Sequence, residues 1–309
     1  MLGAGDGTRL QSLTRHEGVP VPKQYCTLDG RRSLLQLALD RAKRVVATSS
    51  VIAVVAERHR RWWARDLRPL PPRNTVVQPE NRGTGVGVLL PLLEVQRRDP
   101  RGRAVVLPSD HWVEHEGVLA EAIDSAFELL EQDPSRILLL GMSPDQPEPG
   151  YGWIVPGPAF SANGNLPLHA VDAFVEKPDV ETAIRLMGRG GLWNSFLIVA
   201  TVPALIDLYA RRLPHLVGLL GAAVQDESCL TLAGLYAGLD HHDFSRDLLQ
   251  GSEPDLGVVH VPLCGWTDLG TPVRVAACVR RSAVRPVDAR GATRATDRVN
   301  LAFVLGTQG

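Results

Sequence analysis

Apolar and polar residues follow two different periods along the first half of this chain, and the two alternate. The segment "SLLQLALDRAKRVVA" (33–47) has apolar residues at helical spacing, whereas "SVIAVVA" (50–56) is a β-branched run typical of a buried strand. Further strands are expected at 75–78, 103–108 and 136–141, and further helices around Trp62 and Trp63, at 85–96 and at 116–131. Because alternating strands and helices form helix-covered parallel sheets, we predict an α/β fold with a mostly parallel mixed sheet.

The second half of the chain is more irregular. Residues 143–153 are rich in proline and glycine and are interpreted as a connection, and a helix is expected to begin near Asp179. Strands are expected at 170–178, 192–200 and 256–263, helical segments across 203–250, and a last helix at 272–281. From Ser282 onward the composition shifts to Arg, Ala, Thr and Asp without periodicity, so 282–309 is expected to be a weakly ordered tail.

Composition excludes several classes of protein. The chain has 309 residues, with 33 basic and 34 acidic side chains and a formal net charge of −1, so we expect neither a nucleic acid nor a membrane surface as partner. It contains no apolar run of the roughly 20 residues that span a bilayer and no secretory signal pattern. Four widely spaced cysteines without a C-x-x-C pair fit a reducing compartment, so a cytoplasmic location is expected.

A glycine-rich stretch, "GAGDGTRL" (3–10), begins after only two residues. Gly3, Gly5 and Gly7 let backbone N–H groups approach a ligand closely, and successive N–H groups favour an anion such as a phosphate. A dinucleotide fingerprint needs glycine or alanine where Thr8 stands, and a Walker loop needs Gly-Lys at positions 8 and 9, so both are excluded. A phosphate-holding loop and a plain surface turn are the two interpretations that remain.

Two aspartates each follow an apolar strand. "VVLPSDHWV" (105–113) runs into Ser109 and Asp110, and "CGWTDLGTP" (264–272) carries Asp268 in a compact turn. An Asp at the carboxyl end of a parallel strand is well placed for Mg²⁺ and a nucleotide phosphate, although Asp and Ser are also common as turn caps. Because Mg²⁺ takes one or two carboxylates with phosphate oxygens and water, the two aspartates together predict one shared ion.

Basic and polar residues occur in short motifs around these aspartates. Lys23 lies in "PKQY" (22–25), where Pro22 fixes the approach of the chain and Arg9 can face the same phosphates. Further motifs are "GYGW" (150–153), "VEKP" (175–178) and "WNS" (193–195). Carboxylate and amide groups in these motifs can bind sugar hydroxyls and a lysine can pair with a phosphate, although each residue alone is more often solvated or structural.

Taken in order, these segments resemble the sugar-phosphate nucleotidyltransferases, and specifically the bacterial mannose-1-phosphate guanylyltransferases. The matching pieces are "GAGDGTRL", "PKQY", "QPENRGTG" (78–85), "LPSDH" (107–111), "GYGWI" (150–154), "FVEKP" (174–178), "LWNSF" (192–196) and "GWTDLG" (265–270). "QPENRGTG" and "LPSDH" favour the guanylyl branch. The resemblance implies a Rossmann-like fold of the glycosyltransferase-A type and the transfer of GMP from GTP to mannose 1-phosphate, which gives GDP-mannose and pyrophosphate.

The resemblance also implies roles for individual residues. Arg9 and the loop N–H groups hold the triphosphate, Lys23 neutralises the developing charge, and Asp110 and Asp268 hold Mg²⁺. The residues implied to bind the nucleotide are Gly3, Ala4, Gly5, Gly7, Thr8, Gln78, Asn81, Gly83, Thr84 and Ser109. Those implied to hold the mannose and its phosphate are Gly152, Glu176, Lys177 and Asn194.

Three departures from the family pattern affect these expectations. The apolar first strand is reduced to Leu2, so either it begins upstream of Met1 or the sheet has lost it. Ala4 stands where relatives often carry glycine, and Phe196 stands where many relatives carry glycine, which leaves the identity of the sugar open. The chain also lacks the C-terminal β-helix or cupin-like isomerase domain of longer relatives, so a bifunctional enzyme is not expected.

These observations predict one nucleotidyltransferase domain over 1–281, with a nucleotide-binding half at about 1–142 and a sugar-phosphate-binding half at about 143–281. Its substrates are expected to be GTP and mannose 1-phosphate, and the family resemblance implies a homodimer. Two alternatives stay open: the same chemistry on another nucleotide and hexose 1-phosphate pair, and a non-catalytic subunit that binds a sugar nucleotide.

Overall fold

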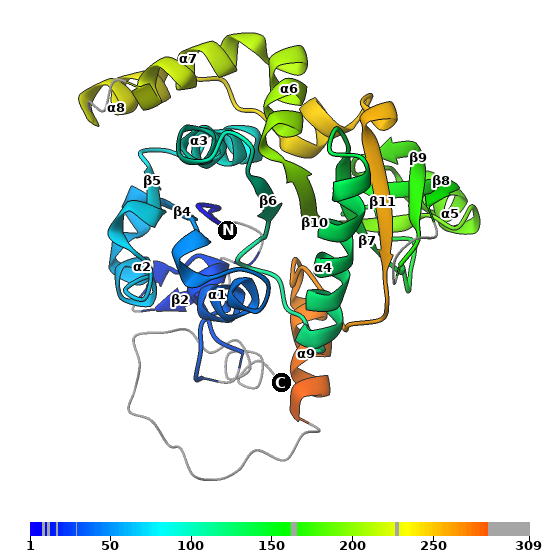
Figure 1. Ribbon diagram of the computed structural model, residues 1–309. Helices are drawn as coiled ribbons and strands as arrows, with labels where there is room; N and C mark the ends of the chain where they lie inside the picture. The colour runs from blue at the N-terminus through cyan, green and yellow to red at the C-terminus, as the bar shows by residue number, and fades with distance from the viewer. Residues whose placement is uncertain are drawn as a thin grey trace. The chain divides into compact units, whose positions relative to one another are not determined.

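The computed structural model describes residues 1–7, 10, 13–16, 18–28, 30–161, 166–225 and 229–283 of the chain (Figure 1). These residues form two compact units. Unit 1 comprises Met1–Val77, Pro108–Glu114 and the chain from Gly265 onward, and unit 2 comprises Gln78–Leu107 and His115–Cys264. These two units are defined by structural contacts and not by ligand binding. The expected nucleotide-binding half at 1–142 and sugar-phosphate-binding half at 143–281 therefore stay a prediction. The predicted tail at 282–309 lies outside the described residues from 284 on.

Unit 1 has a small sheet in the order β1-β4-β5, formed by β1 (Leu2–Gly3), β4 (Ala53–Ala56) and β5 (Thr75–Gln78). Leu2 and Gly3 pair in parallel with Val54 and Val55, and Leu2 also forms a parallel bridge with Pro108. The first strand is thus present as two residues with a partner on each side. It places the start of the glycine-rich loop next to the segment that carries Asp110.

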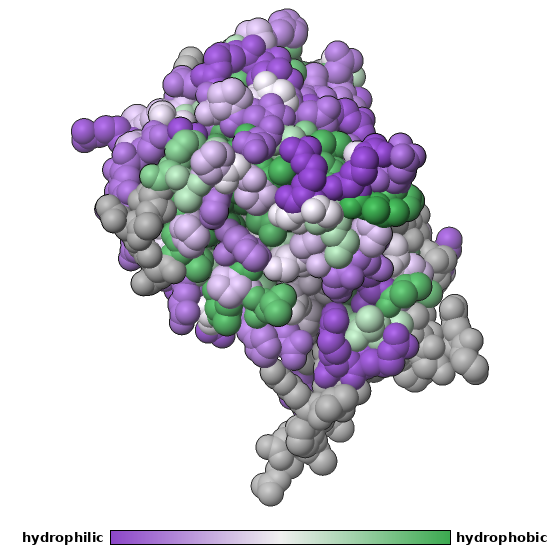
Figure 2. All heavy atoms as spheres, turned by 90° about the vertical axis from the view of Figure 1, so that its right-hand side faces the viewer, coloured by the Kyte–Doolittle hydropathy of each residue, from purple (hydrophilic) through white to green (hydrophobic). Residues whose placement is uncertain are grey.

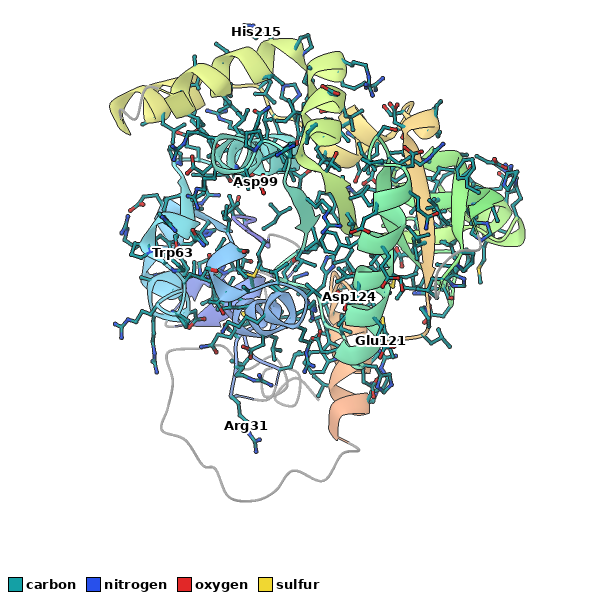
Figure 3. The ribbon with its side chains drawn as sticks, viewed as in Figure 1. Arg31, Trp63, Asp99, Glu121, Asp124 and His215 are labelled. Carbon is teal, nitrogen blue, oxygen red and sulfur yellow. The ribbon has the colours of Figure 1, made fainter. Side chains whose placement is uncertain are left out.

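Three helices of unit 1 agree with the sequence: α1 (Leu34–Val45), α2 (Arg60–Asp66) and α9 (Pro272–Ala283). Helix α1 begins at a capping box in which the Ser33 hydroxyl accepts from the Gln36 backbone N–H and the Gln36 side chain accepts from the Ser33 backbone. Trp63 of α2, labelled in Figure 3, donates its indole N–H to the Ala56 carbonyl at 2.8 Å. A short antiparallel pair, β2 (Arg15–His16) and β3 (Val19–Pro20), leads to the 3₁₀ turn η2 (Lys23–Tyr25).

Unit 2 is built on a six-stranded sheet in the order β6-β10-β7-β11-β9-β8. Its strands are β6 (Arg103–Val106), β7 (Ile137–Met142), β8 (Trp153–Ser161), β9 (Leu168–Val175), β10 (Leu192–Thr201) and β11 (Leu256–Val261). Its helices are α3 (Gly83–Arg98), α4 (Glu116–Gln132), α5 (Val180–Gly188), α6 (Val202–Arg212), α7 (Pro214–Gln225) and α8 (Cys229–Gly238). A π-helical turn (Ser245–Leu249) and a 3₁₀ turn (Glu253–Asp255) precede β11.

Helix α4 shows how the core of unit 2 forms. It packs on β7, β10 and β11 (Figure 1), and Leu119, Ile123 and Ala126 on its inner face are fully buried. Glu121 and Asp124, labelled in Figure 3, lie on the exposed side. This spacing buries apolar surface on one face of the helix, at about 25 cal/mol for each Å² of apolar area removed from water.

The α/β class with helix-covered sheets is confirmed, but the balance of strand directions differs from the expectation. Among the described pairs of unit 2, β7 and β11 are parallel, whereas β10 runs antiparallel to β6, β7 and β8, and β9 runs antiparallel to β8 and β11. The physical reason is β10, which inserts between β6 and β7 in the opposite direction. A mixed sheet of this kind is common in large α/β folds.

Strand β8 was not expected, because Pro156, Gly157 and Pro158 interrupt its pattern. It lies at the end of the sheet order and its pairing with β9 shifts register after Val155, after Pro156 and after Ala159. Edge strands and bulges tolerate proline, since the missing N–H need not pair there. The helical segments expected across 203–250 are also interrupted, since residues 239–243 are not helical.

The distribution of apolar side chains on the surface and the polarity of the helices are those of an ordinary globular protein. Figure 2 shows apolar side chains interspersed among polar ones on the face at the right-hand side of Figure 1, as is usual for globular proteins. Within the part of the chain that the structure describes, every helix is too short or too polar to traverse a lipid bilayer.

Candidate active site

The glycine-rich loop of unit 1 is held by the segment that carries Lys23. Gln24 donates its side-chain amide to the carbonyls of Gly3 at 2.9 Å and Gly5 at 2.7 Å. Gly7 has φ +59°, and a Cβ there would lie 2.9 Å from the backbone nitrogen of Lys23, so only glycine fits. The loop therefore has a fixed backbone from Gly3 to Gly7. Thr8 and Arg9, which the sequence assigns to the nucleotide, lie outside the described residues.

The two aspartates predicted to share a metal ion lie side by side in unit 1. Trp112 and Thr267 exchange two backbone hydrogen bonds, at 2.9 and 3.0 Å, which joins the segment of Asp110 to that of Asp268. The Lys23 ammonium lies 2.8 Å from Asp110 Oδ2 and also donates to the backbone carbonyl of Asp268. Residues far apart in the chain thus meet around one buried lysine.

The charges of this group are set by burial and by Lys23. Burial is the largest single influence on Asp110 and disfavours its ionised form, but the charge and hydrogen bond of Lys23 together with the neighbouring His111 hold the pKa of Asp110 below its usual range. Burial lowers the pKa of His111 to about 4, so its ring is neutral at pH 7. Trp266 donates its indole N–H to His111 Nδ1 at 3.2 Å, which leaves the ring proton on Nε2, 3.7 Å from Asp110 Oδ1.

The chemistry of this donor set fits a divalent cation that prefers oxygen ligands. Asp110 and Asp268 supply two carboxylates, and no cluster of three or more potential metal ligands occurs among the described residues. Mg²⁺ fits such a set, because it takes one or two carboxylates and completes its shell with phosphate oxygens and water. The Ser109 hydroxyl, next to Asp110 in the chain, is buried and has no hydrogen-bond partner among the described atoms.

The predicted sugar-phosphate residues meet in unit 2, where three strand ends converge. Gly152 precedes β8, Glu176 follows β9 and Asn194 lies near the start of β10. The Asn194 backbone N–H donates to the Gly152 carbonyl at 2.8 Å. A Cβ on Gly152 would lie 2.6 Å from Glu176 Oε2 and 3.2 Å from Asn194 Cβ, so this position has no room for a side chain.

Glu176 carries the clearest polar signal of this cluster. Its Oε1 pairs with the Lys177 ammonium at 2.9 Å, while its Oε2 is buried and has no hydrogen-bond partner among the described atoms. Burial raises the pKa of Glu176, and the ammonium of Lys177 opposes that shift. A buried carboxylate oxygen without a partner is costly, and a ligand hydroxyl would satisfy it.

Two further residues of unit 2 support this cluster and were missed by sequence reasoning. Asn194 donates its amide to the Ser245 hydroxyl at 3.4 Å, and the Glu176 backbone N–H donates to Gln250 Oε1 at 3.2 Å. Ser245 begins the π-helical turn Ser245–Leu249 and Gln250 follows it. Single π turns occur often at functional sites, but this segment shows only ordinary helical spacing in the sequence.

The residues predicted to bind the guanine or ribose lie around the start of α3 in unit 2. Gln78 donates its amide to the Tyr236 hydroxyl at 3.0 Å, and the Thr84 hydroxyl accepts from the Phe244 N–H at 2.8 Å. Asn81 accepts from the N–H of Gly83 at 3.0 Å. The structure thus brings Gln78, Asn81, Gly83 and Thr84 to one end of α3, and their contact with a base stays a prediction.

Known proteins match this chain in sequence and in fold. The family model described as "Nucleotidyl transferase" matches residues 1–277. Mannose-1-phosphate guanylyltransferase of Salmonella montevideo is 32% identical over 283 residues, which are 88% of this chain and 57% of that protein. Xanthan biosynthesis protein XanB of Xanthomonas campestris pv. campestris (strain B100) is 30% identical over 285 residues, again 88% of this chain and 57% of that protein. The chain therefore spans little more than half the length of these curated relatives.

Solved structures show the same fold. The crystal structure of mannose-1-phosphate geranyltransferase from Thermus thermophilus has a TM-score of 0.75 and 26% identity, covering 87% of this chain and 75% of that one. UDP-glucose pyrophosphorylase complexed with UDP-glucose has a TM-score of 0.59 and 15% identity, covering 92% and 97%, and supports the fold alone. The fold is that of the nucleotide-diphospho-sugar transferases, as predicted. With nearly nine-tenths of its length matched, the chain belongs to the nucleotidyl transferase family.

Proposed function

We propose that this chain transfers GMP from GTP to mannose 1-phosphate and releases GDP-mannose and pyrophosphate. The observation that carries the proposal is the contact of one buried lysine, Lys23, with both Asp110 and Asp268, which the sequence had implied as partners. The names of relatives that match 88% of the chain support the choice of nucleotide and sugar.

The proposed step needs no nucleophile from the protein. A phosphate oxygen of the sugar 1-phosphate attacks the α-phosphorus of GTP in line, the bond to the β-phosphate oxygen breaks, and pyrophosphate leaves with that electron pair. Such a reaction depends on positioning and on neutralising charge. Lys23, fixed against Asp110, is placed to neutralise charge that develops on the phosphates, and the loop N–H groups from Gly3 to Gly7 and Arg9 are proposed to hold the triphosphate.

Enzymes of this family generally use a divalent metal, and we propose Mg²⁺ for this one. Asp110 and Asp268 would hold it, and when bound it supplies charge neutralisation to the phosphates. Ser109, Gln78, Asn81 and Thr84 are proposed to contact the nucleotide, together with the backbone at Ala4 and Gly83.

The sugar is proposed to bind at the three strand ends of unit 2. The free Oε2 of Glu176 accepts a sugar hydroxyl, Asn194 supplies an amide that can donate and accept, and Lys177 pairs with the phosphate. Gly152 lets Glu176 and Asn194 approach each other, because a side chain at this position would displace the Glu176 carboxylate.

A pyrophosphate-release assay over a panel of nucleoside triphosphates and sugar 1-phosphates tests the proposal. We expect the highest kcat/KM with GTP and mannose 1-phosphate, and a drop of at least about 100-fold in Asp110→Asn, which keeps the shape of the side chain but loses its charge. Folded protein that turned over no pair would contradict the proposed activity. A different best pair would keep the reaction and correct the substrate, and binding of GDP-mannose without any turnover would favour a non-catalytic subunit.

The expected homodimer is part of the same proposal. Light scattering at several protein concentrations measures the mass of the particle directly, and a constant monomer mass would contradict it.

A further inference from the structure

Arg274 lies against a carboxylate that the proposed function assigns to the metal. It comes from the first turn of α9 (Pro272–Ala283), and its Nη1 lies 2.7 Å from Asp268 Oδ1. Both side chains are largely buried, with 11% of Arg274 and 9% of Asp268 exposed. The same Oδ1 accepts the backbone N–H of Gly270 at 2.7 Å. The carboxylate of Asp268 is thus oriented by two donors, one from its own turn and one from the helix that follows.

Two ion pairs lie in this group. Lys23 pairs with Asp110 at 2.8 Å and Arg274 pairs with Asp268 at 2.7 Å, so two positive charges face two negative ones. An unpaired carboxylate couple would attract a divalent ion strongly, because two like charges close together in a partly buried site repel each other. With each carboxylate already paired, a cation that binds alone must compete with a guanidinium at Asp268 and an ammonium at Asp110.

We propose that Arg274 is a positioning residue that occupies Asp268 in the free protein and weakens its binding of a divalent cation, so that the metal binds together with the phosphates of the nucleotide. The inference rests on the proposed function for the role of Asp268. Nucleotide phosphates change the balance in two ways: they add negative charge beside the metal ligands, and they offer the guanidinium a bidentate acceptor in place of the carboxylate.

Binding of Mn²⁺ to the full chain without nucleotide tests this directly. Electron paramagnetic resonance of free Mn²⁺ during a titration gives the dissociation constant without any turnover. We expect Arg274→Gln to bind Mn²⁺ at least about tenfold more tightly than the wild type, because a neighbouring positive charge is removed. Arg274→Lys, which keeps the charge, should stay within about threefold of the wild type.

Two controls separate this effect from others. Arg211→Gln removes the guanidinium of an exposed ion pair with Asp255, 2.5 Å apart in unit 2, and should leave Mn²⁺ binding unchanged. In the double variant Arg274→Gln with Asp268→Asn, the increase in Mn²⁺ affinity should disappear, because the carboxylate that the first substitution leaves unpaired is replaced by an amide. Circular dichroism spectra of each variant establish that it is folded.

An affinity for Mn²⁺ in Arg274→Gln that equals or falls below that of the wild type would overturn the proposal and leave Arg274 as a purely structural partner. If Arg274→Gln does not fold, Arg274→Met, which fills similar volume without charge, must show the same gain. Because the measurement needs no substrate, a protein that fails the pyrophosphate assay can still pass it, and the two proposals fail separately.

Discussion

Three non-glycine residues of the described chain have a backbone conformation that L-amino acids rarely adopt. Lys177, Phe196 and Leu269 have φ values of +47°, +59° and +49°. Each stands one or two positions after a candidate site residue: Glu176, Asn194 and Asp268. Left-handed conformations of non-glycine residues cost about 1 to 3 kcal/mol and persist where surrounding structure enforces them, often at functional sites. Backbone strain therefore occurs within the same motifs that the sequence analysis singled out.

Lys177 allows the strain to be separated from the charge. Lys177→Ala and Lys177→Gly both remove the ammonium that pairs with Glu176, but only glycine relieves the positive φ. We expect Lys177→Gly to be more stable to urea than Lys177→Ala by about 1 kcal/mol. Both variants should show the same increase in KM for the sugar 1-phosphate. Equal stability of the two variants would mean that the backbone at this position is not strained in solution.

The sequence motifs single out charged candidate residues, but not the side chains that contact them in the fold. Lys23, Asp110, Asp268 and Glu176 stand in short motifs at strand ends, where chemistry and fold coincide. Ser245, Gln250 and Arg274 lie in segments with ordinary helical spacing, so nothing in their local pattern distinguishes them. Their importance comes from contacts with residues 6 to 74 positions away, which only the folded chain creates.

At the scale of elements, the candidate sugar-phosphate cluster of Gly152, Glu176, Lys177 and Asn194 depends on the corner where β8, β9 and β10 meet. Trp153 of β8 pairs with Val175 of β9 and with Trp193 of β10, so the residues just beyond these pairs face each other. Those residues are Gly152, Glu176 and Asn194. The register of three strands thus fixes the geometry of the cluster, and a one-residue slip would turn these side chains to the opposite face.

Gly152→Ala tests that corner. The added methyl would lie 2.6 Å from Glu176 Oε2, so the carboxylate must move. We expect KM for the sugar 1-phosphate to rise about tenfold or more, with a smaller change in KM for GTP, as steady-state kinetics with each substrate varied will show. Gly117→Ala in α4 is the matched control, because nothing lies within 4 Å of the added methyl. Equal KM values for Gly152→Ala and the wild type would contradict the placement of the sugar.

The same strands show what the hydrophobic pattern can and cannot predict. Continuous apolar runs predicted β4 and β7, because strands buried on both faces need apolar residues at every position. The run that predicted β11 is interrupted only by the exposed His260. Strand β8 escaped notice because its prolines are compatible only with the edge position that the fold gives it. Strand direction depends on which strands become neighbours, so the antiparallel insertion of β10 between β6 and β7 leaves no trace in local periodicity.

At the scale of the whole molecule, each compact unit is assembled from separate pieces of chain. Unit 1 takes in the short segment Pro108–Glu114 and the chain from Gly265 onward as well as Met1–Val77. Asp110 lies in Pro108–Glu114 and Asp268 lies in the chain from Gly265 onward, so both carboxylates of the candidate metal pair come from segments outside Met1–Val77. The expected halves at 1–142 and 143–281 separate Asp110 from Asp268, because a division at loops and composition shifts follows the order of the chain. The motifs and the family resemblance implied that these aspartates meet, but not which segments form one compact unit.

The two units differ in how protonation affects them. Burial lowers the pKa of His59 and of His111 to about 4, and both residues belong to unit 1. In unit 2 burial raises the pKa of Glu176, and partial burial lowers the pKa of His260, whose side chain is more exposed than those of His59 and His111. Unfolded histidine has a pKa near 6.5 and unfolded glutamate near 4.3. The buried histidines of unit 1 therefore make acidification oppose the folded state, whereas protonation of Glu176 favours the folded state of unit 2.

We expect unit 1 to lose stability before unit 2 as the pH falls from about 6.5 to about 4. In that window the unfolded histidines bind protons that the folded ones do not, so the free energy of unfolding falls by at most about 1.4 kcal/mol per pH unit for each histidine. Above pH 7 both states are neutral at these rings and the effect vanishes. Below about pH 4 the folded rings also take up protons, and the loss levels off.

Hydrogen exchange followed by mass spectrometry resolves the two units, once intrinsic rates are corrected for pH. Peptides from α1 and β4 should lose protection between pH 7 and pH 5 by a larger factor than peptides from β7 and β11. In His59→Asn the pH dependence of protection in unit 1 should weaken, because one of the two buried histidine rings is absent. Equal losses of protection in the two units, or an unchanged dependence in His59→Asn, would show that these histidines do not govern the response to acid.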